Sequence, residues 1–158
     1  MGCRVTSADL TGSDPEAVET AQRRARPVHL RWQYLALVGA GGMVGTALRE
    51  LLTLTIPSIG QFPVATFCIN VCGAFLLGVL LETLVRRGQD EGRRRTLRLL
   101  FGTGLLGGFT TYSALATDTG LLIAGGNIGI ALLYSLGTLV VGALATWAGI
   151  AGSAAVHK

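Results

Sequence analysis

The apolar residues of this sequence gather in four long runs, which shorter polar or basic segments separate. The runs cover about residues 32–52, 64–85, 97–124 and 127–150. A helix needs about 20 residues to cross the hydrocarbon core of a bilayer, and each run is long enough. Backbone groups in lipid must be satisfied internally, which only helices and closed barrels achieve. The pattern therefore predicts an all-α membrane protein with a four-span domain over residues 31–152.

The composition agrees with a membrane protein. Hydrophobic residues make up 50% of the chain, charged residues 14%, and the mean hydropathy is +0.54. A soluble domain usually carries roughly a quarter charged residues. Residues 1–30 are polar and lack the apolar core and cleavage site of a secretory signal peptide. We expect this segment to be a disordered cytoplasmic tail.

The basic residues are distributed unevenly between the two ends of the predicted helices. With four spans, the tail, the loop after the second span and the C-terminus lie on one side. Of the 13 Lys and Arg residues, all but Arg49 belong to that side. The positive-inside rule therefore predicts cytoplasmic N- and C-termini in a bacterial plasma membrane. Membrane orientation and contact with lipid explain the pI of 9.4, so we reject nucleic-acid binding.

The third run contains an unusual polar segment near the middle of the predicted span. Two adjacent glycines precede a run of hydroxyls in Gly107-Gly108-Phe109-Thr110-Thr111-Tyr112-Ser113. We interpret this segment as a break in the third helix. Backbone exposed at this depth must be buried in protein, line a cavity or bind an ion. The alternative is a small-residue packing face, which the spacing of Gly104 and Gly108 allows.

Two further polar stripes lie inside the predicted spans. Thr66 and Asn70 are four residues apart in the second span, and Tyr134 and Thr138 repeat this spacing in the fourth. Residues four apart share a helix face, and an unpaired amide in lipid is costly. Each stripe alone is typical of hydrogen bonding between helices. Together with the interrupted third span, the stripes predict a narrow polar pathway for a small ion.

Two other classes of function fit the sequence less well than a channel. The sequence has no nucleophile–base pair and no cluster of metal ligands, so we do not expect an enzyme. A small multidrug exporter is also a four-span dimer, but proton-coupled export needs a carboxylate inside the membrane. Glu50 and Glu82 lie at the ends of their spans instead. The exporter remains the alternative to a channel.

The order of these features resembles the CrcB/Fluc family of fluoride channels over nearly all of residues 35–150. The matching elements are Gly41-Gly42-x-x-Gly45-x-x-x-Arg49, Pro63-x-x-Thr66-x-x-x-Asn70-x-x-Gly73-x-Phe75-x-x-Gly78 and Gly104-x-x-Gly107-Gly108-x-Thr110-Thr111-Tyr112-Ser113. Each element is weak by itself, whereas their order within a short four-span chain is specific.

The resemblance implies a passive channel that exports fluoride from the cytoplasm and so lowers its toxicity. It implies an antiparallel dimer with two pores and a central structural sodium ion, bound by the backbone carbonyls of Gly107 and Thr110. The implied pore residues are Thr66, Asn70, Tyr112, Ser113, Tyr134 and Thr138. Fluoride holds its water strongly, so such a pore must replace that water with N–H and O–H donors and aromatic ring edges.

Two further charged residues, Arg49 and Asp118, lie near the ends of spans. Arg49 either attracts anions into the vestibule or anchors its helix at the interface, balanced by Glu50. Asp118 stands where the family usually has Glu, and we interpret it as a solvated residue at a pore mouth.

The chain departs from the family at one position of the third span. The family has Phe at the position of Tyr112 and again three residues later, where this chain has Leu115 without a ring. An antiparallel homodimer also requires insertion in both directions, which the uneven basic residues disfavour. We therefore expect a paralogous partner of opposite orientation that supplies the second ring. A homodimer, or a chain that is only the pore-incomplete subunit of a heterodimer, remains an alternative.

Overall fold

The computed structural model describes residues 32–88 and 90–156, and this part of the chain is helical apart from its connections. The chain divides into two compact units, residues 1–35 and 36–158, and the packing described below is that of the second unit. Four helices are long and apolar enough to cross a membrane, which confirms the all-helical, four-span prediction. The tail predicted over residues 1–30 lies outside the described residues, as does Lys158.

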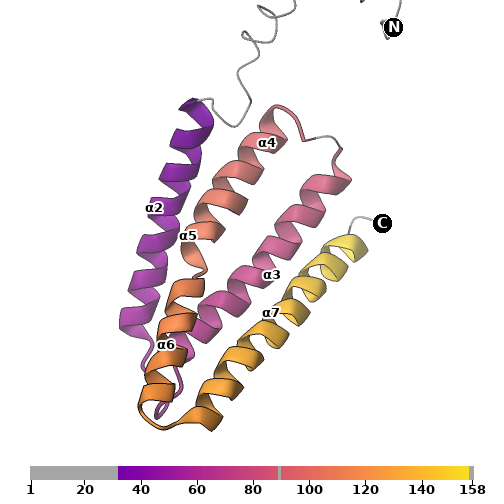
Figure 1. Cartoon of the computed structure of the whole chain (residues 1–158). Helices are drawn as coiled ribbons and strands as arrows, with labels where there is room; N and C mark the ends of the chain where they lie inside the picture. Colours follow the sequence, from indigo (N-terminus) through magenta and orange to yellow (C-terminus); the bar gives the residue numbers. More distant parts are fainter. Residues whose placement is uncertain (1–31, 89, 157–158) are drawn as a thin grey trace, which may run out of the picture. The chain divides into compact units, whose positions relative to one another are not determined.

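The first, second and fourth spans are single helices, α2 (Trp32–Thr55), α3 (Val64–Arg86) and α7 (Ile128–Val156). The third span consists of consecutive segments, α4 (Arg93–Leu97), the π-helical segment η3 (Arg98–Leu106), α5 (Gly107–Phe109) and α6 (Tyr112–Ala124). The α3–α4 connection lies at one end of the bundle, and the α2–α3 and α6–α7 connections lie at the other (Figure 1). We call the first of these the arginine end, after the six arginines between Arg86 and Arg98.

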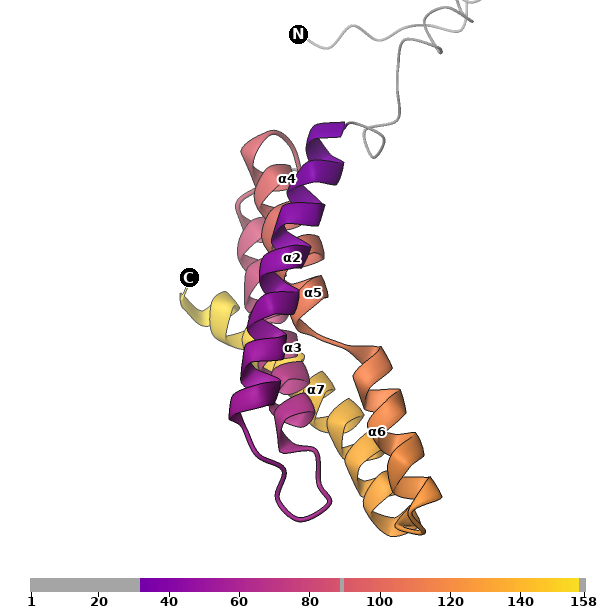
Figure 2. The same cartoon turned by 90° about the vertical axis from the view of Figure 1, so that its left-hand side faces the viewer.

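Helices α3 and α7 lie side by side and share the largest helix contact (Figures 1 and 2). Two glycines allow this approach. A Cβ atom added to Gly78 of α3 would collide with the carbonyl oxygen of Thr146 on α7, and one added to Gly149 would collide with that of Phe75. Small residues let membrane helices pack with their backbones close together, because no long side chains hold the helices apart.

Helix α2 packs against η3 and α5 in the same way. Added Cβ atoms on Gly41 and Gly45 would collide with backbone atoms of Leu100 and Leu105, and one on Gly108 would lie 3.0 Å from the Cα atom of Gly42. An added Cβ on Gly104 would likewise meet the Val38 carbonyl oxygen at 2.9 Å. The small-residue packing face considered for the third span is therefore present, alongside the polar segment that follows it.

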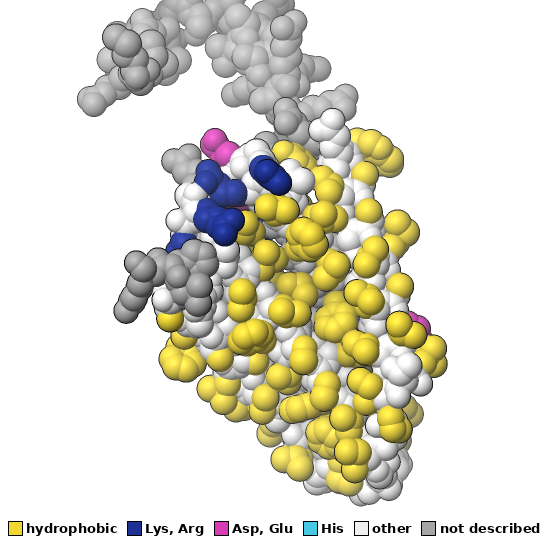
Figure 3. Space-filling view, turned by 180° about the vertical axis from the view of Figure 1, so that it is seen from behind, with side chains coloured by type: hydrophobic (Ala, Val, Ile, Leu, Met, Phe, Trp, Pro, Cys, Tyr) yellow, Lys and Arg dark blue, Asp and Glu magenta, His cyan; other side chains and the backbone are white. Residues whose placement is uncertain are grey.

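The face of the second unit that Figure 3 shows is largely apolar. Large side chains such as Leu133, Leu139 and Val140 are more than half exposed, whereas the buried apolar cluster contains only a few residues. Lys and Arg side chains gather at one end of this surface (Figure 3). An apolar belt with charges at its end suits a lipid environment, in which apolar side chains have no reason to be buried.

Candidate functional site

Two residues with extended backbone separate α5 from α6 in the third span (Figure 2). Thr110 has φ −76° and ψ 153°, and Thr111 has φ −148° and ψ 116°. Helix α5 closes before them through the Thr110 N–H, which donates to the Leu106 carbonyl at 2.9 Å. Helix α6 begins after them with Thr111 as its N-cap, because the Thr111 hydroxyl accepts from the N–H of Ala114 at 3.2 Å.

Asn70 of α3 binds both backbone groups of Thr111. Its Nδ2 donates to the Thr111 carbonyl at 3.1 Å, and its Oδ1 accepts from the Thr111 N–H at 2.8 Å. The side-chain amide thus repeats the paired hydrogen bonds that two β-strands exchange. An extended backbone in lipid would otherwise leave these groups unsatisfied, at a cost of several kcal/mol each. The predicted pore asparagine therefore also secures the polar segment of the third span.

These hydrogen bonds divert two donors from the helix. In a continuous α-helix the N–H of Thr111 would bond the Gly107 carbonyl, and the N–H of Ala114 would bond the Thr110 carbonyl. The Thr111 N–H is taken by Asn70 instead, and the Ala114 N–H by the Thr111 hydroxyl. The carbonyls of Gly107 and Thr110, to which the family resemblance assigns a sodium ion, are therefore among those that lose their helical donors at the interruption.

A polar cleft with a volume of about 310 Å³ opens beside this segment, between α2, α3 and α6. It brings together three predicted site residues, Arg49, Thr66 and Ser113. The whole lining consists of Arg49, Glu50, Thr53, Thr66, Ile69, Thr111, Ser113, Ala114, Thr117 and Asp118. Ion pairs between described residues lie at the arginine end and do not involve Arg49 or Glu50. The cleft therefore offers a guanidinium and several hydroxyls to a small anion, close to two carboxylates.

Tyr134 and Thr138 do not line this cleft and are both buried in the bundle. The Tyr134 side chain is fully buried, and its hydroxyl donates to the Asp118 carboxylate at 3.0 Å. Thr66 is a second polar neighbour of that hydroxyl. The Phe62 ring meets the Tyr134 ring edge to face, with centroids 5.4 Å apart. The Thr138 hydroxyl donates to the Tyr134 carbonyl of its own helix at 2.6 Å.

Tyr112 stands apart from the other predicted residues. Its side chain is 80% exposed at the start of α6, although it follows directly after the interruption. Leu115, three residues later, is buried and packs in a cluster with Leu122, Ala131 and Tyr134. Tyr112 and Leu115 are the two positions at which the resembled family places aromatic rings. In this chain Tyr112 is exposed, whereas Leu115 is part of the buried core.

Comparison with known proteins identifies the family. Residues 36–150 match the model of the CrcB-like protein family, described as Camphor Resistance (CrcB). The chain belongs to this family. It is 53% identical over 136 residues to the fluoride-specific ion channel FluC 2 of Leifsonia xyli subsp. xyli, covering 86% of this chain and 94% of that protein. It is 45% identical over 118 residues to FluC 1 of Cutibacterium acnes, covering 74% and 82% of the two chains.

A third similar protein is also named as a fluoride channel. The fluoride-specific ion channel FluC of Novosphingobium aromaticivorans is 43% identical over 119 residues, covering 73% of this chain and 91% of that protein. The resemblance stated from the motifs is thus confirmed at the level of the family.

The structure adds Thr111 and Asp118 to the candidate site of this CrcB-like chain. Threonine directly before a helical run is a known N-cap signal, which could have assigned Thr111. Asp118 and Tyr134 lie at equal distances along the chain from Gly126, in the α6–α7 turn. An antiparallel helix hairpin brings such positions together, so their pairing could have been expected. Asp118 is half-buried and hydrogen-bonded, which makes the interpretation as a solvated mouth residue incomplete.

Proposed function

We propose that this chain is one subunit of a passive, fluoride-selective channel that exports fluoride across the bacterial plasma membrane and so lowers its toxicity. The observation that carries the proposal is the polar cleft beside Thr111, because it gathers hydroxyls and a guanidinium within an otherwise apolar bundle. The family supports it, since relatives that align over most of their length are named fluoride-specific ion channels.

Fluoride gives up its water only where other donors replace it. In the proposed pore, Arg49 attracts the anion to the cleft, and the hydroxyls of Ser113 and Thr66 take over part of its hydration. An asparagine amide has two N–H donors, and the Thr111 carbonyl accepts from the Asn70 amide. The second Asn70 N–H is the donor that the proposal assigns to fluoride. Larger chloride is excluded in this proposal because Thr111 holds the Asn70 amide through two hydrogen bonds, so that the amide cannot move to accommodate a larger ion.

The proposed track continues from Thr66 to Tyr134 and Thr138. Thr66 neighbours the Tyr134 hydroxyl, which is also bonded to Asp118. A hydroxyl that donates to Asp118 in the absence of the anion can turn to donate to fluoride when it arrives. Tyr112 supplies a ring edge from its exposed position, where a second subunit would complete the pore wall.

A structural sodium ion fits the interruption of the third span. The carbonyls of Gly107 and Thr110 lose their helical donors, and carbonyl oxygens are suitable ligands for a hard cation. Such an ion would supply positive charge that compensates these carbonyls in the membrane. Two carbonyls are too few to replace its hydration shell, so we propose that an antiparallel second subunit contributes an equivalent pair.

The second subunit is proposed to be a paralogue of opposite orientation. Basic residues are concentrated on one side of the predicted spans, which favours one orientation of this chain. The numbered names FluC 1 and FluC 2 among the relatives are consistent with paralogous pairs. The partner would supply the ring that Leu115 lacks.

A fluoride efflux assay tests the proposed function. The purified chain is reconstituted into liposomes loaded with fluoride, alone and with a paralogue from the same genome, and a fluoride electrode records release. We expect fluoride release without chloride release, and no dependence on an imposed proton gradient. Release of a cationic dye driven by a proton gradient would support the exporter alternative instead. Absence of fluoride flux with the partner present would refute the channel.

A further inference from the structure

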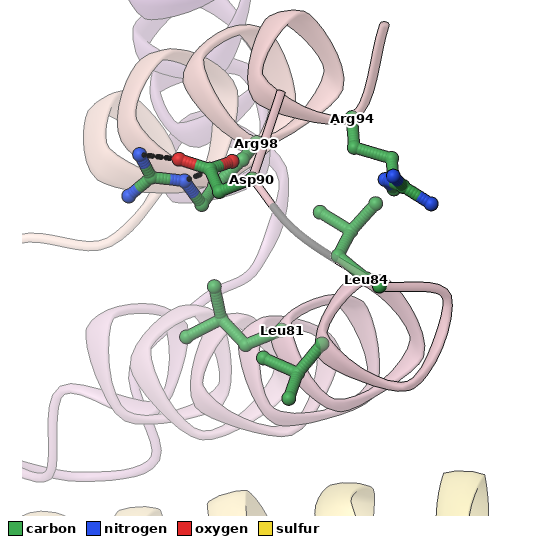
Figure 4. A pocket seen from close by; sticks show the side chains of 7 residues that line it. Leu81, Leu84, Asp90, Arg94 and Arg98 are labelled. Atoms are coloured by element: carbon green, nitrogen blue, oxygen red, sulfur yellow. Dashed lines mark hydrogen bonds and ion pairs between the residues drawn. The ribbon is translucent and has the colours of Figure 1, made fainter. Parts of the chain in front are cut away.

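A second pocket lies at the arginine end, far along α3 from Asn70. It has a volume of about 430 Å³ and lies between the end of α3 and the start of the third span. One wall is apolar and is formed by Leu81, Leu84 and Val85 of α3. The other contains Gly88, Asp90, Arg94 and Arg98 (Figure 4). The cavity is therefore amphipathic, with an apolar floor beneath a basic rim.

Hydrogen bonds hold the basic rim in place. The Arg98 guanidinium binds the Asp90 carboxylate through two contacts, of 2.6 and 3.1 Å (Figure 4). Arg94 donates to the carbonyl of Arg87 across the loop. Arg94 and Arg98 lie on consecutive helical segments and extend toward opposite ends of the pocket (Figure 4). Two guanidinium groups thus border one cavity, and only one acidic side chain, Asp90, shares its lining.

The apolar wall lies where a membrane-spanning helix ends. Helix α3 ends at Arg86, and Leu81 and Val85 in its last turns are 39% and 71% exposed. The loop and the adjoining segment contain six arginines, against the carboxylates of Glu82, Asp90 and Glu91. Exposed apolar side chains beneath an excess of positive charge match a molecule with an anionic head and an apolar tail.

We propose that this pocket binds an anionic membrane phospholipid. The phosphate lies between Arg94 and Arg98, and the upper part of an acyl chain lies along Leu81, Leu84 and Val85. Charge complementarity selects an anionic headgroup, since basic pockets between membrane helices bind such lipids. Free phosphate has no apolar part to cover the leucines. The proposal does not depend on fluoride conduction, because no residue of the pocket belongs to the cleft beside Thr111.

Native mass spectrometry of the purified full chain tests lipid binding. The probe is dioleoylphosphatidylglycerol, and dioleoylphosphatidylcholine is the neutral control. We expect phosphatidylglycerol to be retained preferentially, and R94Q/R98Q to lower its retention more than tenfold, at roughly fivefold per arginine. The matched control is R93Q, which removes an exposed arginine of the same helix that does not line the pocket. It should change retention less than twofold.

Two further variants and a competition with inorganic phosphate separate a lipid site from general charge and from a folding defect. R94K/R98K keeps both charges and should restore most of the retention. D90N removes the carboxylate that competes with the lipid phosphate for Arg98, and should raise retention. If Arg98 only holds the loop in place through Asp90, D90N will instead lower the retention of phosphatidylglycerol. Equal losses in R93Q and R94Q/R98Q, equal retention of phosphatidylcholine, or displacement of the lipid by millimolar inorganic phosphate would each overturn the proposal.

Discussion

Asn70 and Thr111 are 41 residues apart in sequence and bind each other through two hydrogen bonds, of 3.1 and 2.8 Å. One side-chain amide on α3 thereby satisfies both backbone groups of a residue in the interrupted third span. This pairing fixes the rotation of α3 relative to the interruption. It also places the polar stripe of Thr66 and Asn70 against the segment that carries Thr111 and Ser113.

Replacement of Asn70 by leucine should abolish fluoride efflux and destabilise the protein. The leucine side chain would leave the Thr111 N–H and carbonyl without their partner, and the proposed pore donor would be lost. Hydrogen bonds between membrane helices contribute about 0.6–2 kcal/mol each. Fluoride release from liposomes and the melting temperature in detergent measure the two effects. Wild-type efflux from Asn70→Leu would show that the pore lies elsewhere.

The control for this variant is Thr83→Val. Thr83 of α3 exchanges a hydrogen bond of 2.8 Å with Ser153 of α7, toward the arginine end and away from the cleft. Its loss should lower the melting temperature to a similar or smaller extent while efflux continues. If both variants stop efflux equally, the loss in Asn70→Leu reflects general destabilisation rather than a pore function.

Replacement of Gly45 by alanine should separate α2 from η3. The added Cβ would collide with the Leu105 carbonyl and lie 2.8 Å from the Phe109 nitrogen, both of which are backbone atoms. Overpacking of this kind costs about 1–3 kcal/mol. Gly39 lies on the same helix with open space around its Cβ position, so Gly39→Ala is the matched control. Equal melting temperatures for the two variants would contradict this packing.

The four spans could be predicted because the membrane imposes a length on every apolar run. Contacts between spans could not be predicted from the apolar runs, because they depend on the rotation of each helix about its axis and on its position across the membrane. The Thr66–Asn70 spacing indicated a shared face, but not that Asn70 would bind the backbone of Thr111. The π-helical turns of η3 also have no distinct sequence signal, because they differ from an α-helix only in hydrogen-bond partner.

Polar residues inside the bundle were easier to identify than their partners. Tyr134 was expected to line a pathway, and the structure adds that its hydroxyl is bonded to Asp118 of the neighbouring helix. The hairpin turn at Gly126 determines this pairing, so it follows from the length of the connection rather than from either residue. No pattern in the sequence indicated that Tyr112 would be 80% exposed at the start of α6.

Asp118→Asn should leave fluoride efflux passive. Asparagine keeps an oxygen that can accept from the Tyr134 hydroxyl, and it removes a negative charge from the cleft. We therefore expect efflux equal to or faster than wild type at any imposed proton gradient. Liposome assays with acidic and neutral exteriors measure this. If the proton gradient drives fluoride efflux by the wild-type chain, and Asp118→Asn abolishes this dependence, the result would favour a proton-coupled transporter.

Sodium should be required for stable assembly. If the carbonyls of Gly107 and Thr110 from two subunits enclose one ion, its removal leaves carbonyls in the membrane without a partner. Exchange of Na⁺ for N-methyl-D-glucamine should lower both dimer stability and fluoride flux, and return of Na⁺ should restore them. Size-exclusion chromatography with light scattering and the efflux assay record the two quantities. Indifference of both to the exchange would argue against the sodium site.

The orientation of the chain in the membrane should be fixed, with both termini in the cytoplasm. The tail, the α3–α4 connection with its flanking helix ends, and the C-terminus together carry all of the Lys and Arg residues except Arg49. Short loops next to span ends have the strongest effect on orientation, and the α3–α4 connection and its flanks contain six arginines. Trp32 and Trp147 are both largely exposed, as aromatic anchors at an interface would be.

A fixed orientation excludes an antiparallel homodimer and predicts a partner inserted the other way. Reporter fusions after Lys158, active on only one side of the membrane, measure the orientation directly, and a fusion in the α2–α3 connection should give the opposite result. The chain alone should then show little fluoride flux, and flux should appear when the paralogue is added. A substantial population with Lys158 outside, together with strong flux from the chain alone, would mean that the arginine bias is only partly obeyed and that a homodimer conducts.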